Sequence, residues 1–480
     1  MNMTMVSFIG FLLIFALIGL ASMYQRQANT SDYLIAGRSV SPWLAALSAV
    51  ATNNSGFMFI GMIGLTYTTG LSSIWLMLGW ITGDLIASLL IMKQVRTTAE
   101  VQNTQSFGGL LADWHGENFN FLRRVTGILT ILFLGAYAAA QFTAGSKALH
   151  VLFDWDLSSG AIIGAAMVLL YSYSGGIRAS IWTDAAQSIV MIFSMMILMW
   201  VAINHLGTPM QINESLTNVS PTFMNWFPEG SWLTISLFIV GWIFAGFGVA
   251  GQPHIIIRYM ALDDAENISR FRVWYYTWFT LFYAATIVVG LLARLLLPDA
   301  GSFDAELALP MISQQLLPDV LVGLMLAGLF AATMSTADSL VLSCSAAITR
   351  DLLPEHKASY GITKLSTAAV IVIALGLSLY GSQSVFALVL IAWGLLASAF
   401  APLLTVYALG YHPTEKAALV MMGASVTTFL LWRELGLSDT AYEAMPAIIA
   451  GIGLYFFLPS SQRHAAGSLH VRLPCDNEKI

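Results

Sequence analysis

The chain has 480 residues, of which 57% are hydrophobic and only 10% are charged. A soluble domain carries about 25% charged residues, so the composition excludes a protein whose whole surface is covered by water. The net charge of -6 is small for this length and does not indicate a nucleic-acid partner. Two cysteines, Cys344 and Cys475, are too few for a disulfide framework or a cysteine-based metal site.

Hydrophobic segments follow one another along the whole chain. The first of them, residues 6–24, reads VSFIGFLLIFALIGLASMY, which exceeds the roughly 18 apolar residues that indicate a membrane-spanning helix. It lacks the basic start and the small-residue cleavage site of a signal peptide, so we expect it to be retained. About thirteen such segments are expected, at 6–24, 43–68, 71–93, 123–153, 158–174, 179–204, 231–257, 272–298, 318–349, 362–381, 384–409, 415–433 and 443–458.

The loops between these segments are too short to fold as domains. The longest, residues 205–230, is polar and contains Pro and Asn. We therefore expect one polytopic membrane domain over residues 1–458, followed by a short cytoplasmic tail over residues 459–480. The predicted fold class is an all-α integral membrane protein.

The basic residues predict how the chain is oriented in the membrane. If the N-terminus lies outside, Lys147, Arg294 and Arg433 are on the outer side, and all the other Lys and Arg residues fall in cytoplasmic loops or in the tail. Cytoplasmic loops are enriched in Lys and Arg. We therefore expect an outside N-terminus, a cytoplasmic C-terminus and a location in the plasma or inner membrane of the cell.

A glycine motif interrupts the segment at 231–257. The stretch GFGVAGQPH at 246–254 matches the G-x-G-x-x-G pattern of a dinucleotide-binding turn, but that turn follows a β-strand, and a strand in lipid would leave backbone groups unsatisfied. Close helix packing is a second interpretation, since small residues let backbones approach in membranes. The third is a helix broken inside the membrane, because the glycines and Pro253 weaken it at successive turns.

A partner for this break lies in the second segment. Thr52, Asn53, Asn54, Ser55 and Gly56 place residues that disfavour helix in the middle of an otherwise apolar span. The second and seventh segments lie five apart and would cross the membrane in opposite directions. We therefore predict a five-plus-five inverted-repeat core, formed by segments 2–6 and 7–11, with two broken helices near the midplane.

The ninth segment carries a row of hydroxyl groups. Ala332, Ser335, Thr336 and Ser339 share one helix face, and Asp338 borders that face. Hydroxyls in membrane helices often bond back to their own helix. A carboxylate inside a membrane span, however, indicates a functional site.

Two other segments place oxygen atoms in the same half of the membrane as Ser339. At a rise of about 1.5 Å per residue, Asp184, Asn53 and Ser339 lie roughly 9, 15 and 16 Å from the cytoplasmic ends of their segments. Hydroxyl, carboxylate and freed carbonyl oxygens suit hard cations, and the scarcity of charge favours a monovalent ion. Sodium is the expected coupling ion, with a proton carried on Asp184 or Asp338 as the alternative.

The remaining ionisable residues indicate no enzyme. The eight histidines are scattered without a metal-ligand spacing, and no nucleophile lies in a pattern with a base. Asp84, in the third segment, is a further buried acid whose role stays open between a structural hydrogen bond and a place near the lipid headgroups.

Five stretches, in this order, resemble the sodium:solute symporter family, which includes sodium/proline symporters and sodium/glucose cotransporters. They are SDYLIAGRSVSPW (31–43), NNSGF (53–57), YSYSGGIRASIWTDAAQ (171–187), GQPHIIIRYMA (251–261) and AATMSTADSLVLSCSAAITRDL (331–352). Together they extend over most of the chain, whereas any one alone would be weak. The resemblance implies the helix number and the inverted core predicted above.

The resemblance also implies where cations bind. One sodium site would combine oxygens of the broken second segment with the hydroxyl face of the ninth, at Ala51, Asn54, Ala332, Ser335 and Thr336. In some members a second cation site matches four positions that carry side-chain oxygen here, Asp184, Ser335, Asp338 and Ser339.

The solute is less sharply implied. Sodium/proline symporters carry an Asp where this chain has Asn53, and aromatic residues where it has Ala245 and Val249. Sugar-transporting members use polar and basic side chains in the pocket, and the middle of the eighth segment offers none. Half-helix N-termini favour anionic groups, so we expect a compact zwitterion or carboxylate, such as a proline-like amino acid. The candidate solute contacts are Asn53, Ser55, Gly56, Gln141, Phe247 and Gly248.

The predicted function is a sodium-coupled secondary symporter that imports a small organic solute by alternating access. Its partners would be the solute, sodium and the lipid bilayer, and no nucleic acid. Two alternatives stay open. One is a transporter-like receptor that binds solute without driving uptake, and the other is a proton-coupled carrier of the same fold.

Overall fold

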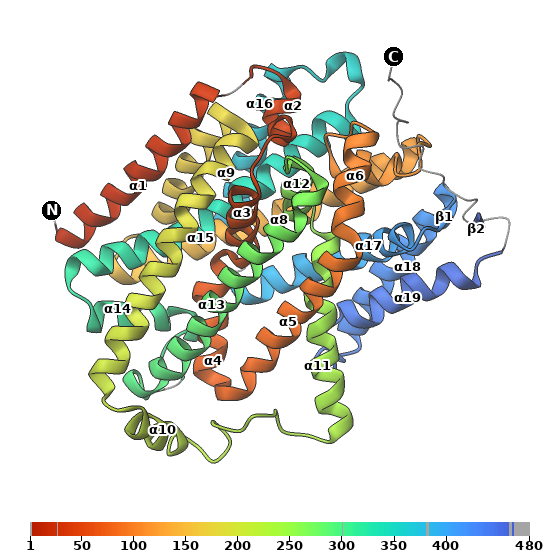
Figure 1. Cartoon of the computed structure of the whole chain (residues 1–480). Helices are drawn as coiled ribbons and strands as arrows, with labels where there is room; N and C mark the ends of the chain where they lie inside the picture. Colours follow the sequence, from red (N-terminus) through yellow and green to blue (C-terminus); the bar gives the residue numbers. More distant parts are fainter. Residues whose placement is uncertain (1, 26, 300, 381–383, 460–462, 465–480) are drawn as a thin grey trace, which may run out of the picture.

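The computed structural model describes residues 2–25, 27–299, 301–380, 384–459 and 463–464, and most of them are helical. Figure 1 shows long helices packed side by side, with short helices at the ends of the bundle. Within these residues, the only strands are β1 (His412–Pro413) and β2 (Arg463–His464), which pair antiparallel. Helices suit a chain in lipid because each satisfies its own backbone hydrogen bonds.

The helices range from six to 50 residues in length. Short 3-10 or π turns extend several of them. In chain order the helices are α1 (Met3–Ala21), α2 (Thr30–Ile35), α3 (Pro42–Gly56), α4 (Ile63–Thr69), α5 (Ile74–Ala87), α6 (Lys93–Val101), α7 (Phe107–Ala112), α8 (Asn120–Phe153), α9 (Leu157–Leu206), α10 (Pro209–Thr217), α11 (Trp232–Phe247), α12 (Pro253–Ala261), α13 (Ile268–Leu296), α14 (Ala308–Leu316), α15 (Asp319–Ala346), α16 (Tyr360–Tyr380), α17 (Val385–Ala408), α18 (Glu415–Glu434) and α19 (Ala444–Phe457).

The lengths of the apolar helices can be compared with the segments expected from the sequence. By length and composition, the described part of the chain contains 9 helical stretches able to cross a membrane, fewer than the segments expected. Two of them, Pro42–Val101 and Leu157–Leu206, have 60 and 50 residues, so each is long enough for two crossings. The expected segments 415–433 and 443–458 correspond to α18 and α19, which are not among these stretches.

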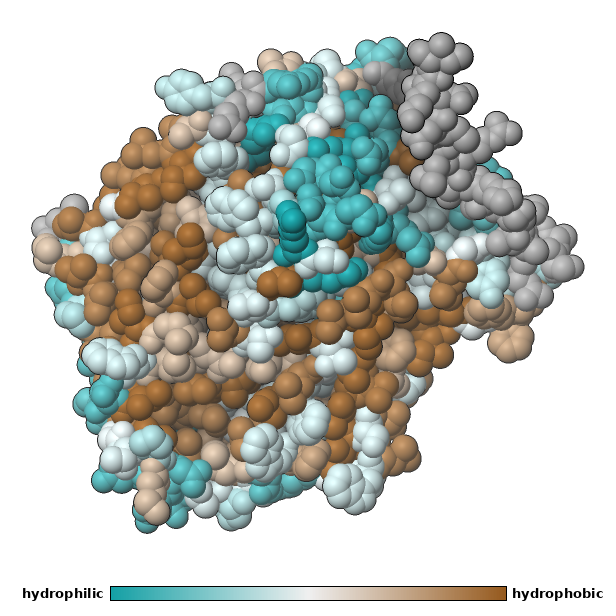
Figure 2. All heavy atoms as spheres, viewed as in Figure 1, coloured by the Kyte–Doolittle hydropathy of each residue, from teal (hydrophilic) through white to brown (hydrophobic). Residues whose placement is uncertain are grey.

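The outer surface has the polarity contrast of a protein that lies in lipid. In Figure 2, hydrophobic residues cover the flanks, while hydrophilic residues gather at the upper end and along the lower edge. Figure 1 places α2 and α6 toward the upper end and α10 at the lower edge. Leu17, Leu132 and Trp200 are 64%, 61% and 67% exposed, and so large an apolar surface would be unfavourable in water.

The first helix break lies at Ser55, near the end of α3, where the sequence predicts one. Ser55 has φ 47° and ψ -175°, a backbone conformation that costs a residue with a side chain about 1–3 kcal/mol. A π-helical turn over Phe57–Met62 then leads into α4. The Phe57 amide donates to Ser55 Oγ at 3.1 Å, which helps to hold the break.

The second break separates α11 from α12. A 3-10 turn covers Gly248–Gly251, and Gln252 is extended, with φ -101° and ψ 96°, before Pro253 begins α12. The predicted interruption over 246–252 is therefore present. Close packing contributes as well, since a Cβ on Gly246 would collide with the carbonyl oxygen of Trp80. A helix rather than a strand precedes the glycines, so this is not a dinucleotide-binding turn.

A kink divides α9 at Gly176. This residue has φ 58° and ψ -145°, a region that is essentially restricted to glycine. A Cβ at Gly176 would collide with the carbonyl oxygen of Tyr33 in α2. The expected segments 158–174 and 179–204 meet at this kink.

The most buried long helix is α15, which packs against α1, α3, α8 and α9. Its most apolar stretch is 83% buried, compared with 61% for the corresponding stretch of α8. Ser335, Thr336 and Ser339 have no exposure at all. The hydroxyl row therefore faces protein and not lipid.

Candidate cation and solute site

The hydroxyl row of α15 meets the last helical turn of α3, just before the break. Ser335 Oγ lies 3.4 Å from the carbonyl oxygen of Ala51, and Thr336 Oγ1 lies 2.9 Å from that of Thr52. Both hydroxyls also bond to the carbonyl oxygen of Ala332, at 3.2 and 3.0 Å. Oxygen atoms from two helices thus converge at a place that solvent does not reach.

The break supplies carbonyl groups that an unbroken helix would use itself. In a continuous helix the Gly56 amide would donate to the carbonyl of Thr52. Here it donates to Gln141 Oε1 at 2.9 Å instead, and the Thr52 carbonyl accepts from Thr336. Asn54 Nδ2 donates to the Val50 carbonyl at 2.6 Å. Hydroxyl and carbonyl oxygens are the ligands that hard cations prefer, so this donor set fits a sodium ion.

A second cluster surrounds a buried guanidinium group. Arg258 of α12 is fully buried, and its Nη2 lies 3.2 Å from Asp184 Oδ2 and 2.9 Å from Ser180 Oγ. The same nitrogen donates to Ser339 Oγ, while Nε donates to Ser48 Oγ at 3.1 Å. Ser48 in turn donates to Asp184 Oδ2 at 2.6 Å.

Asp338 borders the same cluster. Its Oδ1 accepts from Ser339 Oγ at 3.0 Å. In the described part of the chain, Asp338 Oδ2 and Asp184 Oδ1 are buried without a hydrogen-bond partner. Ser335 lies between the two clusters, because its carbonyl accepts from Ser339 Oγ at 2.6 Å while its hydroxyl belongs to the first cluster.

The sequence did not indicate Arg258 as a site residue. The charge count assigned it to a cytoplasmic loop, and that assignment is wrong, because Arg258 lies within α12 and is fully buried. One signal could have found it. Pro favours the first position of a helix, so a helix that restarts at Pro253 would continue past residue 257 and include Arg258.

Polar groups with unused hydrogen-bonding capacity line the first break. Tyr137 donates to Ser55 Oγ at 3.4 Å. Gln141 Nε2 and both ring nitrogens of His254 are buried without a partner among the described residues, and the His254 ring packs edge-on against Tyr137, with centroids 5.7 Å apart. Sequence reasoning anticipated Ser55, Gly56 and Gln141 here, but not Tyr137 or His254.

Among the described residues, Asn53 bonds to Asp84 and Tyr275 and not to the polar groups at the first break. Its Nδ2 donates to Asp84 Oδ2 at 3.1 Å and to the Tyr275 hydroxyl at 2.5 Å. Asp84 also accepts from Tyr275 at 3.0 Å and from Tyr276 at 2.7 Å. Asp84 has no exposure and accepts from three donors, which supports the structural role that the sequence left open.

The second break packs on α17. A Cβ on Gly248 would lie 2.6 Å from Ala397 Cβ and 3.2 Å from Trp393 Nε1. Phe247 is half-buried, and its ring packs against that of Phe244, with centroids 6.4 Å apart. Of the candidate solute residues, the structure thus brings Ser55, Gly56 and Gln141 into one group, while Phe247 and Gly248 have other neighbours.

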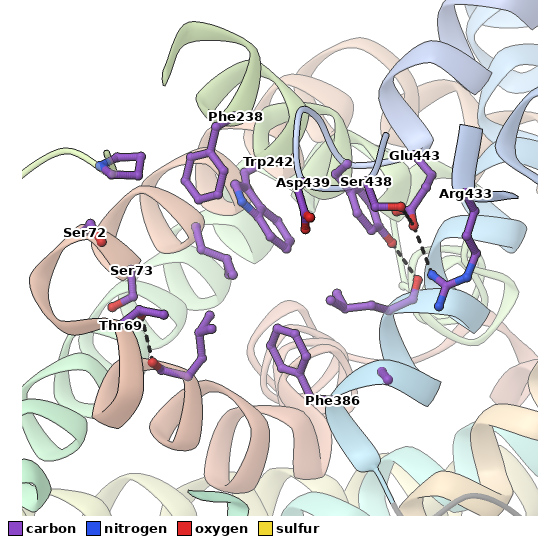
Figure 3. A pocket seen from close by; sticks show the side chains of 16 residues that line it. Thr69, Ser72, Ser73, Phe238, Trp242, Phe386, Arg433, Ser438, Asp439 and Glu443 are labelled. Atoms are coloured by element: carbon purple, nitrogen blue, oxygen red, sulfur yellow. Dashed lines mark hydrogen bonds and ion pairs between the residues drawn. The ribbon is translucent and has the colours of Figure 1, made fainter. Parts of the chain in front are cut away.

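A cavity of about 440 Å³ lies near α4, α11, α17 and the segment that joins α18 to α19. Figure 3 shows Phe238, Trp242 and Phe386 along its wall, and Arg433 paired with Glu443 at 3.0 Å on one side. A mostly apolar cavity with a few polar groups is typical of a small-molecule site. The sequence did not predict this cavity, because residues far apart in the chain form its wall.

An aromatic layer lies between this cavity and the first break. Phe386, in the cavity wall, stacks on Phe57 with ring centroids 5.3 Å apart, and Phe57 directly follows the break. Trp80 lies 5.7 Å from Phe57 and 4.9 Å from Trp393. The Phe386 amide donates to Glu306 Oε1 at 2.9 Å, which fixes the start of α17.

Polar contacts join the helices at the end of the bundle opposite the cavity. Asp32 of α2 binds Arg178, beside the kink of α9, at 2.5 Å. Arg96 of α6 donates to the carbonyls of Leu262 and Asp263, at 2.7 and 2.9 Å. These contacts tie α2 to α9 and α6 to the segment after α12, toward the upper end of Figure 1, whereas α4 and α11, which line the cavity, extend toward the lower end.

These features define a membrane transporter whose interrupted helices present carbonyl and hydroxyl oxygens to a buried site, as in secondary transporters. The chain belongs to the sodium:solute symporter family, whose model matches residues 33–422.

Two relatives match almost the whole chain. The high-affinity proline transporter PutP of Bacillus subtilis is 29% identical over 446 residues, which cover 91% of this chain and 93% of the relative. The sodium/proline symporter of Escherichia coli is 29% identical over 452 residues, which cover 89% and 88%. The family and these relatives are transporters.

Two solved structures share the fold. A Na+-coupled sialic acid symporter, in a substrate-bound outward-open state, gives a TM-score of 0.78 at 17% identity and covers 96% of this chain and 98% of its own. A nucleobase-cation-symport-1 family transporter, in a closed conformation with bromovinylhydantoin bound, gives a TM-score of 0.53 at 14% identity, with coverages of 89% and 94%. At these identities the likeness shows the fold alone.

Proposed function

We propose that this protein is a sodium-coupled secondary symporter that imports a small organic solute, either a proline-like amino acid or a carboxylate. The observation that carries the proposal is the contact of the Ser335 and Thr336 hydroxyls with the carbonyls of Ala51 and Thr52 at a helix break. Family membership supports sodium as the coupling ion. The relatives named for proline support an amino acid as the solute. Transport rather than enzyme chemistry is the activity.

Sodium would bind where the two helices meet, at Ala51, Asn54, Ala332, Ser335 and Thr336. The ion would take the place of the hydrogen bonds from the Ser335 and Thr336 hydroxyls to the carbonyls. The hydroxyl groups would rotate, keep their protons and turn their oxygen lone pairs toward the ion. Each ion that moves inward across 100 mV contributes about 2.3 kcal/mol. That free energy drives uptake of the solute.

The solute would bind at the breaks, at Asn53, Ser55, Gly56, Gln141, Phe247 and Gly248. The support is strongest at the first break, where Gln141 Nε2 offers an unused donor to a carboxylate. Ser55 and Gly56 directly follow the residues of the sodium site, so the ion would order the backbone that holds the solute. By linkage, the solute must tighten sodium binding by the same factor.

We propose the following arrangement in the membrane. The 9 apolar stretches, second crossings within the two longest of them, and α18 and α19 together account for the thirteen spans expected from the sequence. Segments 2–6 and 7–11 form the inverted repeats. Residues 1–458 are one membrane domain, and the tail over 459–480 lies almost wholly outside the described residues. The N-terminus is outside the cell and the C-terminus is cytoplasmic, so the cavity faces outward.

The test is uptake by the purified protein in liposomes, with radiolabelled proline, other amino acids, carboxylates and sugars. An inward sodium gradient should drive accumulation of one class, and replacing sodium by choline at fixed pH should abolish it. Solute binding without accumulation would identify a receptor instead. Accumulation driven by a proton gradient in choline would identify a proton-coupled carrier.

A further inference from the structure

Arg258 brings a permanent positive charge into the interior of the protein. A guanidinium group keeps its proton in proteins, and this one has no exposure to solvent. Its Nη1 donates to the carbonyl of His254 on its own helix at 2.7 Å, so the charge is anchored to α12. The rest of the group contacts residues of α3, α9 and α15.

We propose that the Arg258 guanidinium is the resident cation of the second site, so that a sodium ion is excluded from the oxygens of Asp184 and Ser339. This inference builds on the proposed function, because it determines how many ions the symporter takes per cycle. It does not concern the first sodium site at Ala51 and Ser335.

The contacts explain the exclusion. Nη2 of Arg258 uses Asp184 Oδ2, Ser180 Oγ and Ser339 Oγ as acceptors. The second cation site that the resemblance implies uses the same residues, Asp184 and Ser339. A sodium ion bound to their oxygen atoms would lie within a few ångströms of the guanidinium, and two positive charges so close together in a buried place repel each other strongly. Arg258 and a second sodium ion therefore compete for this place.

The charges of the cluster support the same conclusion. Asp184 and Asp338 are both fully buried, and each has a carboxylate oxygen without a partner in the described part of the chain. A buried charge that loses its partner is strongly destabilised. Without Arg258 the cluster would hold only acidic groups and hydroxyls, so it would recruit a cation from solution.

The experiment counts sodium ions bound to the purified protein at saturation, with radioactive sodium and no solute. The test variant is Arg258→Met, which keeps much of the side-chain volume and removes the charge. Arg258→Lys keeps the charge and should bind as many ions as the wild type. Arg96→Met is the matched control, since Arg96 is also buried, at 1% exposure, and donates to carbonyls outside the cluster.

We expect Arg258→Met to bind one sodium ion more than the wild type, and Asp184→Asn in the same variant to remove the extra ion. An equal count in wild type and folded Arg258→Met would overturn the inference. If Arg258→Met does not fold, the wild-type count decides, because two ions per wild-type protein would also overturn it. The proposed function fails on a different result, namely the absence of sodium-driven uptake by the wild type.

Discussion

Serine residues on α15 occupy two different environments that their spacing does not distinguish. Ser343 Oγ donates to the carbonyl of Ser339, four residues earlier, at 2.9 Å, as hydroxyls in membrane helices commonly do. Ser335 and Thr336 reach beyond their own helix to carbonyls of α3. The sequence predicted the shared face. Only the packing of α3 on α15 distinguishes a hydroxyl that bonds to its own helix alone from one that also contacts the carbonyls of α3.

We therefore expect Ser335→Ala and Thr336→Ala each to raise the sodium concentration for half-maximal uptake by about tenfold, which corresponds to about 1.4 kcal/mol of lost binding. The measurement is solute uptake in liposomes as a function of sodium concentration. Ser343→Ala is the control and should leave the curve within about twofold. A sodium requirement that is unchanged in both test variants would contradict the site.

Asp84 permits a second comparison at this scale. Tyr276 donates to Asp84 Oδ1 at 2.7 Å, whereas the hydroxyl of Tyr283, on the same helix, is buried without a partner among the described residues. Tyr276→Phe should lower stability by about 1–3 kcal/mol, because a buried carboxyl group loses a donor. Tyr283→Phe should be neutral or stabilising. Thermal unfolding in detergent at a fixed scan rate measures both, and equal effects would argue against a structural role for Asp84.

At the scale of elements, α9 shows both the success and the limit of sequence reasoning. The sequence predicted two apolar segments on either side of Gly176, and that division coincides with the kink. It placed a cytoplasmic loop at residues 175–178, between the two segments. The structure retains hydrogen-bonded helix on both sides, since α2 packs against the kink and Asp32 binds Arg178.

The backbone conformation at the kink predicts the effect of replacing Gly176. Gly176→Ala should cost at least the roughly 1–3 kcal/mol of its backbone conformation, and the collision with Tyr33 adds to this. Gly164→Ala, elsewhere on α9, is the control, because its Cβ would lie 3.6 Å from Phe142, an ordinary contact. Yield of monodisperse protein and thermal stability measure the difference. Similar behaviour of the two variants would contradict the strained kink.

At the scale of the whole molecule, the order of the helices and both breaks could be predicted, because apolar length and clusters of Gly, Pro and Asn act locally. Of the residues that approach the first break from other helices, Gln141 was anticipated but Tyr137 and His254 were not. Arg258 was counted as a loop cation, and the partnership of Asp84 with Tyr275 and Tyr276 was not anticipated. The cavity also escaped prediction, since its wall combines α4, α11 and α17.

The proposed orientation in the membrane leads to a prediction about the whole molecule. A cysteine introduced at Ser302 or at Ser359, both exposed, should label on opposite sides in a variant that lacks Cys475 and keeps only the buried Cys344. A membrane-impermeant maleimide should reach Ser302→Cys in intact cells and Ser359→Cys only after permeabilisation. The reverse pattern would invert the proposed topology, and labelling of both in intact cells would contradict the number of spans between them.

The aromatic layer over the first break has a kinetic consequence. If Phe57 and Phe386 only obstruct the path and do not touch the bound solute, a smaller side chain at Phe57 speeds arrival and departure by the same factor. Residence time would then shorten while the equilibrium dissociation constant stayed the same. The rate of solute binding and the affinity for the solute would thus depend on different residues.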